Sequence, residues 1–107
     1  MFDRGDIIVI DFDPSAGQEI QKTRPAFVLS RKIYSRITGL VIISPITSTI
    51  RGWNTEVPLP AALKTCGVVH TQQIHSFDYA ARRARLIEQA PDALIEQVLK
   101  ITRVYFS

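Results

Sequence analysis

The chain has 107 residues, of which 46% are hydrophobic and 21% charged, as in an ordinary globular protein. Thirteen Lys and Arg against ten Asp and Glu give a net charge of +3, a modest excess that would help a polyanion approach. The single Cys66 excludes an internal disulfide, and with only His70 and His75 beside it there is no ligand set for a closed zinc site. No apolar stretch reaches the length of a membrane span. We therefore expect one cytoplasmic domain over residues 1–107, with no membrane, metal or cofactor.

Three buried strands are predicted in the first half of the chain. The run from Asp6 to Phe12 is rich in β-branched residues and is bounded by Gly5 and Pro14. The runs from Pro25 to Ser30 and from Leu40 to Ser44 are apolar on both faces, which is typical of strands inside a sheet. The polar segment 17–23 between the first two runs is expected to be a loop.

The second half predicts shorter elements and a closing helix. Residues 46–54 are polar and predict a long loop. A helical turn is expected at 61–64, and a turn or short helix at 77–82. Further strands are expected at 55–59, 67–74 and 85–88. Behind Pro91 and Asp92, apolar residues recur every three or four positions, at Leu94, Val98, Ile101 and Tyr105. We therefore expect a mainly β fold with α structure, a curled antiparallel sheet closed by a C-terminal amphipathic helix.

The candidate for ligand binding in this frame is Arg24, which stands between a polar loop and a strand. Pro25 biases Arg24 toward extended backbone, so its side chain leaves a rigid element at a defined angle. A guanidinium stays charged and presents a fork of donors that matches phosphate oxygens. The alternative is a surface arginine that closes a strand end or pairs with Asp11 or Asp13.

The remaining polar residues favour phosphate chemistry that needs neither a metal nor a cofactor. The sequence has no glycine-rich phosphate loop, dinucleotide fingerprint or hydrolase elbow. RNA supplies its own nucleophile, the 2′-hydroxyl, so a few side chains around a phosphate suffice for strand scission. The candidate groups are Glu19, Arg24, Thr47, His70, Gln72 and His75. On one regular strand His70 and His75 would point to opposite faces, so at most one serves the site; His70 shares a face with Gln72 and is the better candidate.

Five segments in order resemble the MazF/PemK (Kid) toxins of bacterial toxin-antitoxin pairs. They are RGDIIVIDFDPSAGQE at 4–19, TRPAFVLS at 23–30, SPITS at 44–48, TCGVV at 65–69 and ARRARLIEQAP at 81–91. The resemblance implies a small SH3-like barrel of the CcdB/MazF kind and a homodimer. It also implies a sequence-specific, metal-independent endoribonuclease that cleaves single-stranded mRNA to a 2′,3′-cyclic phosphate and a 5′-hydroxyl. A cognate antitoxin would inhibit it.

Carried over position by position, the resemblance implies roles for individual residues. Arg24 and Thr47 correspond to the catalytic arginine and threonine, Glu19 to an acidic loop residue, and His70 lies on a strand that bears catalytic groups in the Kid-like branch. We further expect five residues to contact the substrate: Gln18, Lys22, Ser48, Gln72 and Arg82.

One difference from the family pattern leaves open which residues transfer protons. The Kid-like branch carries an arginine and an aspartate where this chain has His70 and Gln72, and Gln72 cannot accept a proton. Either His70 substitutes, or the chain uses an Arg and Thr route, or its activity is reduced. Two other functions stay under consideration, a non-catalytic RNA-binding barrel and a CcdB-like toxin that binds gyrase.

Overall fold

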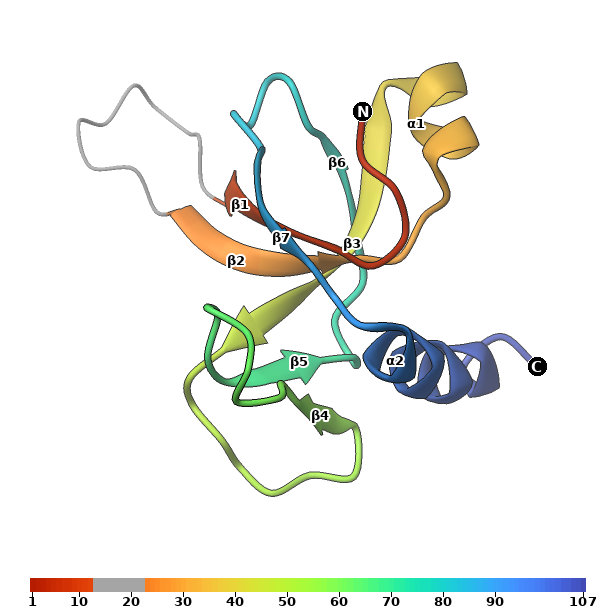
Figure 1. Ribbon diagram of the computed structural model, residues 1–107. Helices are drawn as coiled ribbons and strands as arrows, with labels where there is room; N and C mark the ends of the chain where they lie inside the picture. Colours follow the sequence, from red (N-terminus) through yellow and green to blue (C-terminus); the bar gives the residue numbers. More distant parts are fainter. Residues whose placement is uncertain (13–22) are drawn as a thin grey trace.

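The computed structural model describes residues 1–12 and 23–107. Within these ranges the chain forms seven strands and two helices (Figure 1). In chain order they are β1 (Asp6–Asp11), β2 (Thr23–Val28), α1 (Lys32–Thr38), β3 (Leu40–Thr47), β4 (Glu56–Pro58), β5 (Val68–His70), β6 (His75–Asp78), β7 (Arg85–Gln89) and α2 (Asp92–Val104). The predicted mainly β fold with a C-terminal helix is confirmed. No helix in the described ranges is long and apolar enough to cross a membrane.

The strands form one antiparallel sheet that is organised around β3. Its order is β4-β5-β3-β2-β1-β7, and β6 pairs with the first half of β3. The second half of β3 pairs with β5 through Ile46 and Thr47. Because β3 has different partners along its length, the sheet curls, as the long yellow-green strand of Figure 1 shows. The predicted curled antiparallel sheet is therefore confirmed.

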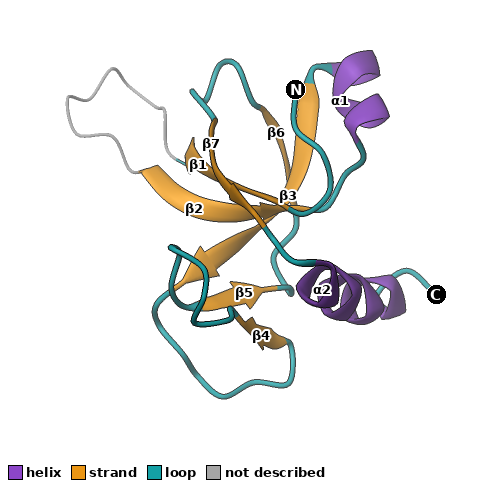
Figure 2. Cartoon of the chain, in the orientation of Figure 1, coloured by secondary structure: helices purple, strands orange, loops and turns teal. Residues whose placement is uncertain are grey.

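Each face of the curled sheet has its own hydrophobic core. One core contains Phe27, Ile46 and Val69 from the strands, and Leu94 and Val98 from α2. The other contains Ile8, Ile10, Ala26, Val28, Val41 and Ile43, with aromatic residues around them. Figure 2 shows α2 against one side of the strands and α1 at the opposite end of the molecule. Successive residues of β2 and β3 point to opposite faces, which explains why these strands are apolar throughout.

The sequence did not predict α1, a helix of seven residues. Its first turn is completed by a distant residue, because Asp3 Oδ1 accepts a hydrogen bond from the Lys32 amide at 2.9 Å. Burial opposes ionisation of Asp3, but hydrogen bonds from the Lys32 and Arg4 amides, together with nearby Arg31 and Lys32, hold the pKa of its carboxyl below the ordinary value. At the other end, Gly39 adopts φ of 73° and its amide bonds Ser35.

Three further expectations are corrected by the structure. Residues 67–74 are not one strand, because the chain turns after His70, where the Gln73 amide bonds the His70 carbonyl at 3.2 Å. The buried Thr71 is held in this turn by the hydroxyl of Tyr105 at 2.8 Å. The segment 77–82 begins as strand β6 and only then turns, and 61–64 forms a turn in place of a helical turn.

Candidate functional site

The predicted residues Arg24 and Thr47 lie in the same pocket. This pocket has a volume of 340 Å³ and is lined by Arg24, Pro25, Ile46, Thr47, Ser48, Thr49 and Cys66. It lies where β2 begins, β3 ends and the segment leading into β5 passes. Of the substrate-contacting residues that we expected, Ser48 also lines it. Among the described residues, no carboxylate or imidazole lines this pocket.

Strand register explains why Arg24 and Thr47 meet. In the β2–β3 ladder Ala26 pairs with Pro45 and Phe27 with Ser44. The same register continued by two residues places Arg24 opposite Thr47, and directly opposed residues of an antiparallel pair project from the same face. Arg24 is exposed, and its guanidinium makes no ion pair or side-chain hydrogen bond within residues 1–12 and 23–107. Of the two carboxylates that the alternative names as partners of Arg24, Asp13 lies outside the described residues.

The Thr47 hydroxyl is oriented by the turn that follows β3. Its Oγ1 accepts a hydrogen bond from the Thr49 amide at 3.0 Å. A hydroxyl that accepts one bond still has its own proton to donate. Thr47 can thus donate to an anion in the pocket while its position is fixed.

The wall opposite Arg24 is formed by the segment that enters β5. Gly67 adopts φ of 118°, and a Cβ placed on it would collide with the Thr47 carbonyl oxygen. Only glycine allows this close approach of two backbones at such a φ. The exposed Cys66 beside it is thereby placed in the pocket lining. Gly67 is not among the site residues predicted from the sequence, although a glycine at the start of a strand is a signal for a close backbone approach.

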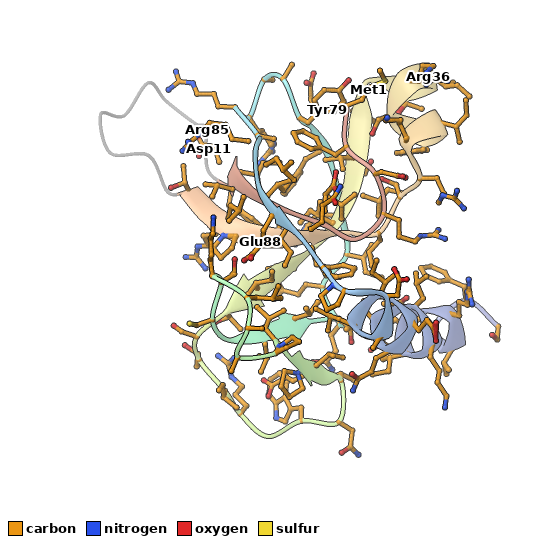
Figure 3. The ribbon with its side chains drawn as sticks, in the orientation of Figure 1. Met1, Asp11, Arg36, Tyr79, Arg85 and Glu88 are labelled. Atoms are coloured by element: carbon orange, nitrogen blue, oxygen red, sulfur yellow. The ribbon has the colours of Figure 1, made fainter. Side chains whose placement is uncertain are left out.

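Glu88 of β7, labelled in Figure 3, hydrogen-bonds the segment that enters β5. Its carboxylate accepts hydrogen bonds from the Lys64 amide at 3.0 Å, and from the Thr65 amide and hydroxyl at 2.8 and 2.7 Å. Burial opposes ionisation of Glu88, but these hydrogen bonds and the charge of Lys64 outweigh it and keep its pKa below the ordinary value. The ionised Glu88 therefore fixes the chain just before Cys66.

His70 does not line this pocket and belongs to a separate cluster. Its Nε2 lies 3.3 Å from the Gln72 Oε1, and its ring meets the Trp53 ring edge-on, with centroids 5.7 Å apart. The shared strand on which this pairing was predicted is not present, because β5 ends at His70 and the turn after it brings Gln72 to the His70 ring. His75 lies on β6, where its ring stacks on Phe77 at 5.1 Å.

Arg82, expected to contact the substrate, bonds the protein itself. Its Nη1 donates to the carbonyls of Asp11 and Phe12 at 3.2 and 3.1 Å, and its guanidinium lies 3.8 Å from the centroid of the Phe77 ring. The side chain thus ties the turn before β7 to the end of β1. Gln18, Glu19 and Lys22 lie outside the described residues.

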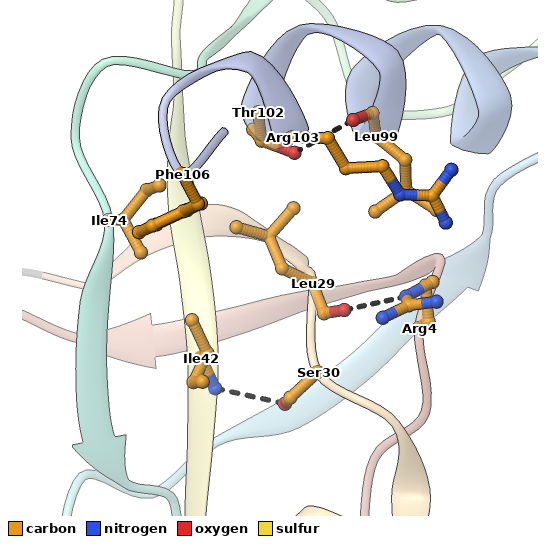
Figure 4. A pocket seen from close by; sticks show the side chains of 9 residues that line it. All are labelled: Arg4, Leu29, Ser30, Ile42, Ile74, Leu99, Thr102, Arg103 and Phe106. Carbon is orange, nitrogen blue, oxygen red and sulfur yellow. Dashed lines mark hydrogen bonds between the residues drawn. The ribbon is translucent and has the colours of Figure 1, made fainter.

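A second pocket, of 290 Å³, lies between α2 and the sheet (Figure 4). Its lining is largely apolar, with Leu29, Ile42, Leu99 and Phe106, and it includes Arg4 and Arg103. The Arg4 Nε donates to the Leu29 carbonyl at 2.8 Å. Burial, together with the charges of Arg31 and Arg103, lowers the pKa of Arg4. Within residues 1–12 and 23–107 no group of three or more His, Cys, Asp or Glu is arranged to hold a metal ion.

Comparison with known proteins identifies the family. The family model described as PemK-like, MazF-like toxin of type II toxin-antitoxin system matches residues 3–106. The chain is 37% identical to the endoribonuclease toxin ChpB of Escherichia coli K12, covering 92% of this chain and 88% of the relative. It is 39% identical to the endoribonuclease toxin MazF of the same strain, covering 77% and 73%.

Solved structures agree with the sequence relatives. The fold matches a chain in the crystal structure of MazE-MazF (Form-III) from Deinococcus radiodurans with a TM-score of 0.89 and 35% identity, covering 98% of this chain and 95% of that one. The chain therefore belongs to the PemK-like, MazF-like toxin family of type II toxin-antitoxin systems.

Proposed function

We propose that this protein is an endoribonuclease toxin that cleaves single-stranded mRNA at specific sequences without a metal ion. The observation that carries the proposal is the pocket in which Arg24 and Thr47 face the same space, in a chain whose relatives are named endoribonucleases. Fold alone would not support an activity, because one fold hosts many functions. The pocket adds a cation and hydroxyls suited to a phosphate.

The proposed reaction is attack of a ribose 2′-oxygen on the adjacent phosphorus. The new P–O2′ bond forms as the P–O5′ bond breaks, which leaves a 2′,3′-cyclic phosphate and a 5′-hydroxyl. A proton leaves the 2′-hydroxyl and another reaches the O5′ leaving group. Arg24 binds the phosphate through its fork of donors and stabilises the negative charge that grows on the phosphorane oxygens. Thr47 donates a hydrogen bond to the same phosphate and fixes it for in-line attack.

Proton transfer is assigned to Glu19 and His70. A guanidinium is a hydrogen-bond donor without an acceptor atom and so cannot serve as the base, and no carboxylate or imidazole lines the pocket among the described residues. Glu19 lies five positions before Arg24 in the sequence. His70 stands two residues after Val68, which pairs with Thr47, so it projects from the same sheet face as Thr47. His70→Ala should lower the single-turnover cleavage rate and leave RNA affinity nearly unchanged, and an unchanged rate would make His70 structural.

A cognate antitoxin is the proposed protein partner. Support comes from the structural similarity to chains in MazE-MazF complexes of Deinococcus radiodurans. The net charge of +3 favours an antitoxin segment that is acidic and competes with RNA for the Arg24 pocket. We further propose that the toxin acts in the cytoplasm as a homodimer.

The test is cleavage of a mixed-sequence RNA by purified protein in EDTA, with both new ends mapped. We expect discrete cuts that carry a 2′,3′-cyclic phosphate and a 5′-hydroxyl, and loss of these cuts in Arg24→Ala. Arg85→Ala is the matched control, because it removes an exposed arginine outside the pocket. Intact RNA with retained binding would contradict the proposal and favour a non-catalytic RNA-binding barrel.

A further inference from the structure

Trp53, the single tryptophan of the chain, has no role of its own in the proposed phosphate chemistry, although its ring contacts the proton-transfer candidate His70. The Arg51 guanidinium lies 5.1 Å from the centroid of its ring, and the His70 ring meets it edge-on. Even with these neighbours, 45% of Trp53 remains exposed. An aromatic face with a cation beside it is a common arrangement for holding an unstacked nucleobase.

The loop that carries Trp53 is fixed by hydrogen bonds to Glu56. The buried Glu56 carboxylate accepts hydrogen bonds from the amides of Arg51, at 3.1 and 3.2 Å, and of Gly52, at 3.0 Å. The Glu56 amide in turn bonds the Trp53 carbonyl at 3.1 Å. Three consecutive residues of this turn are thus joined to Glu56 at the start of β4. The exposed indole is therefore presented by an ordered turn, which lowers the entropic cost of stacking on it.

Register places this cluster on the same sheet face as the Arg24 pocket. Glu56 pairs with His70 in the β4–β5 ladder, and Val68 pairs with Thr47 in the β3–β5 ladder. Val68 and His70 are two residues apart on β5, so they project from one face and are separated by about 7 Å along the strand. An RNA strand whose phosphate binds Arg24 and Thr47 can extend along this face to Trp53.

We propose that Trp53 and Arg51 form a base-binding subsite, in which one nucleobase of single-stranded RNA stacks on the indole beside the phosphate pocket. The inference rests on the proposed function for its substrate class. Stacking on Trp53 supplies affinity and places a nucleotide near the scissile one. It takes no part in bond breaking, so its loss lowers RNA affinity more than the rate of the bound complex.

Emission from Trp53 reports on this subsite directly, because no other tryptophan contributes. The probe is an unlabelled mixed-sequence RNA with 2′-fluoro sugars, which lacks the nucleophile and stays intact. We expect saturable quenching of Trp53 emission, and no quenching by an abasic strand that keeps the sugar-phosphate backbone. Equal quenching by the abasic strand would overturn base stacking. Quenching by polyglutamate but not by RNA would overturn it in favour of an acidic protein partner.

Variants test the same point through affinity, measured by anisotropy of an end-labelled 2′-fluoro RNA. Trp53→Ala should weaken binding about 5- to 150-fold, the range found for removal of one base-stacking aromatic, and Trp53→Phe should retain most of it. Arg51→Ala keeps the fluorescent reporter and should weaken binding less. Ile37→Ala, which removes an exposed apolar residue on α1, is the matched control and should bind as wild type. Wild-type affinity in Trp53→Ala would overturn the subsite.

The two proposals can fail separately. Cleavage of unmodified RNA without any change in Trp53 emission on binding would overturn the subsite and leave the nuclease standing. Saturable quenching without cleavage would overturn the nuclease and support the subsite.

Discussion

Arg24 and Arg4 each line a pocket, but the protein uses the two guanidinium groups differently. Arg4 donates to the Leu29 carbonyl at 2.8 Å, among apolar side chains beneath α2. Arg24 stands at a strand end among hydroxyl groups, and within the described residues its guanidinium makes no ion pair or side-chain hydrogen bond. An arginine in a pocket is therefore not in itself an anion site. Among the described residues, the difference lies in guanidinium donors that bond no protein acceptor and in neighbouring hydroxyl groups that can share an anion.

Removing each arginine in turn tests this comparison with the largest expected effect. Arg24→Ala should lower the single-turnover cleavage rate about 10²- to 10³-fold, the loss typical of one charge-stabilising donor, with almost no change in the free energy of unfolding. Arg4→Ala should lower that free energy by about 1–2 kcal/mol, because the Leu29 carbonyl loses a partner. Rates come from quenched-flow cleavage and stabilities from urea unfolding. Equal effects of both variants on cleavage would contradict the distinction.

Much of the Arg24 pocket follows from local sequence. Pro25 and the apolar run behind it predict β2, and the LVIIS run predicts β3, but both predicted strands stop short of the site residues. The sequence predicts Thr47 in a loop over 46–54, whereas β2 includes Arg24 and β3 runs to Thr47 because pairing with β5 continues the strand. Contacts between distant residues could not be predicted in this way. The Lys32 amide that begins α1 bonds Asp3, 29 positions away, and Glu88 bonds Thr65 across 23 positions. Such partners are set by tertiary packing, and no short pattern in the sequence encodes them.

Gly67 tests whether the shape of the Arg24 pocket depends on one close backbone approach. Gly67→Ala should cost about 3 kcal/mol of folding free energy, from an alanine at positive φ and from its collision with the Thr47 carbonyl. Gly39→Ala is the matched control: Gly39 also has positive φ, of 73°, but a Cβ there would meet open space. It should cost about 1 kcal/mol. If both variants lowered the free energy of unfolding equally in urea, the backbone at Thr47 would adjust to the added Cβ, and the pocket shape would not depend on this close approach.

Arg82 is a third arginine for this comparison, and like Arg4 it donates hydrogen bonds to backbone carbonyls of the protein. Arg82→Ala should cost about 1–2 kcal/mol of unfolding free energy, because its bonds to the Asp11 and Phe12 carbonyls and its contact with Phe77 are lost. RNA affinity of the folded protein should change less than about twofold. Arg85→Ala removes the same charge nearby and controls for general electrostatics. A loss of affinity far beyond that of the control would support the prediction from sequence that Arg82 contacts RNA.

The smallest expected effect on the free energy of unfolding is that of Glu88, and its dependence on pH distinguishes it from other contributions. Because the pKa of folded Glu88 lies below the ordinary value of 4.5, the ionised carboxylate stabilises the fold above that pH. This contribution is lost as pH falls from about 4.5 through the folded pKa, where protonation removes an acceptor for Lys64 and Thr65. Glu88→Gln should cost at most about 1 kcal/mol at pH 7.

The difference in unfolding free energy between wild type and Glu88→Gln should therefore shrink as pH falls below about 4.5. Both proteins keep Asp3, whose pKa is also lowered, so its contribution cancels in the difference. Glu96→Gln, which removes an exposed carboxylate from α2, should show no such convergence. A pH-independent difference would mean that the charge of Glu88 does not hold the segment before Cys66, and that the close approach at Gly67 fixes this wall of the Arg24 pocket without it.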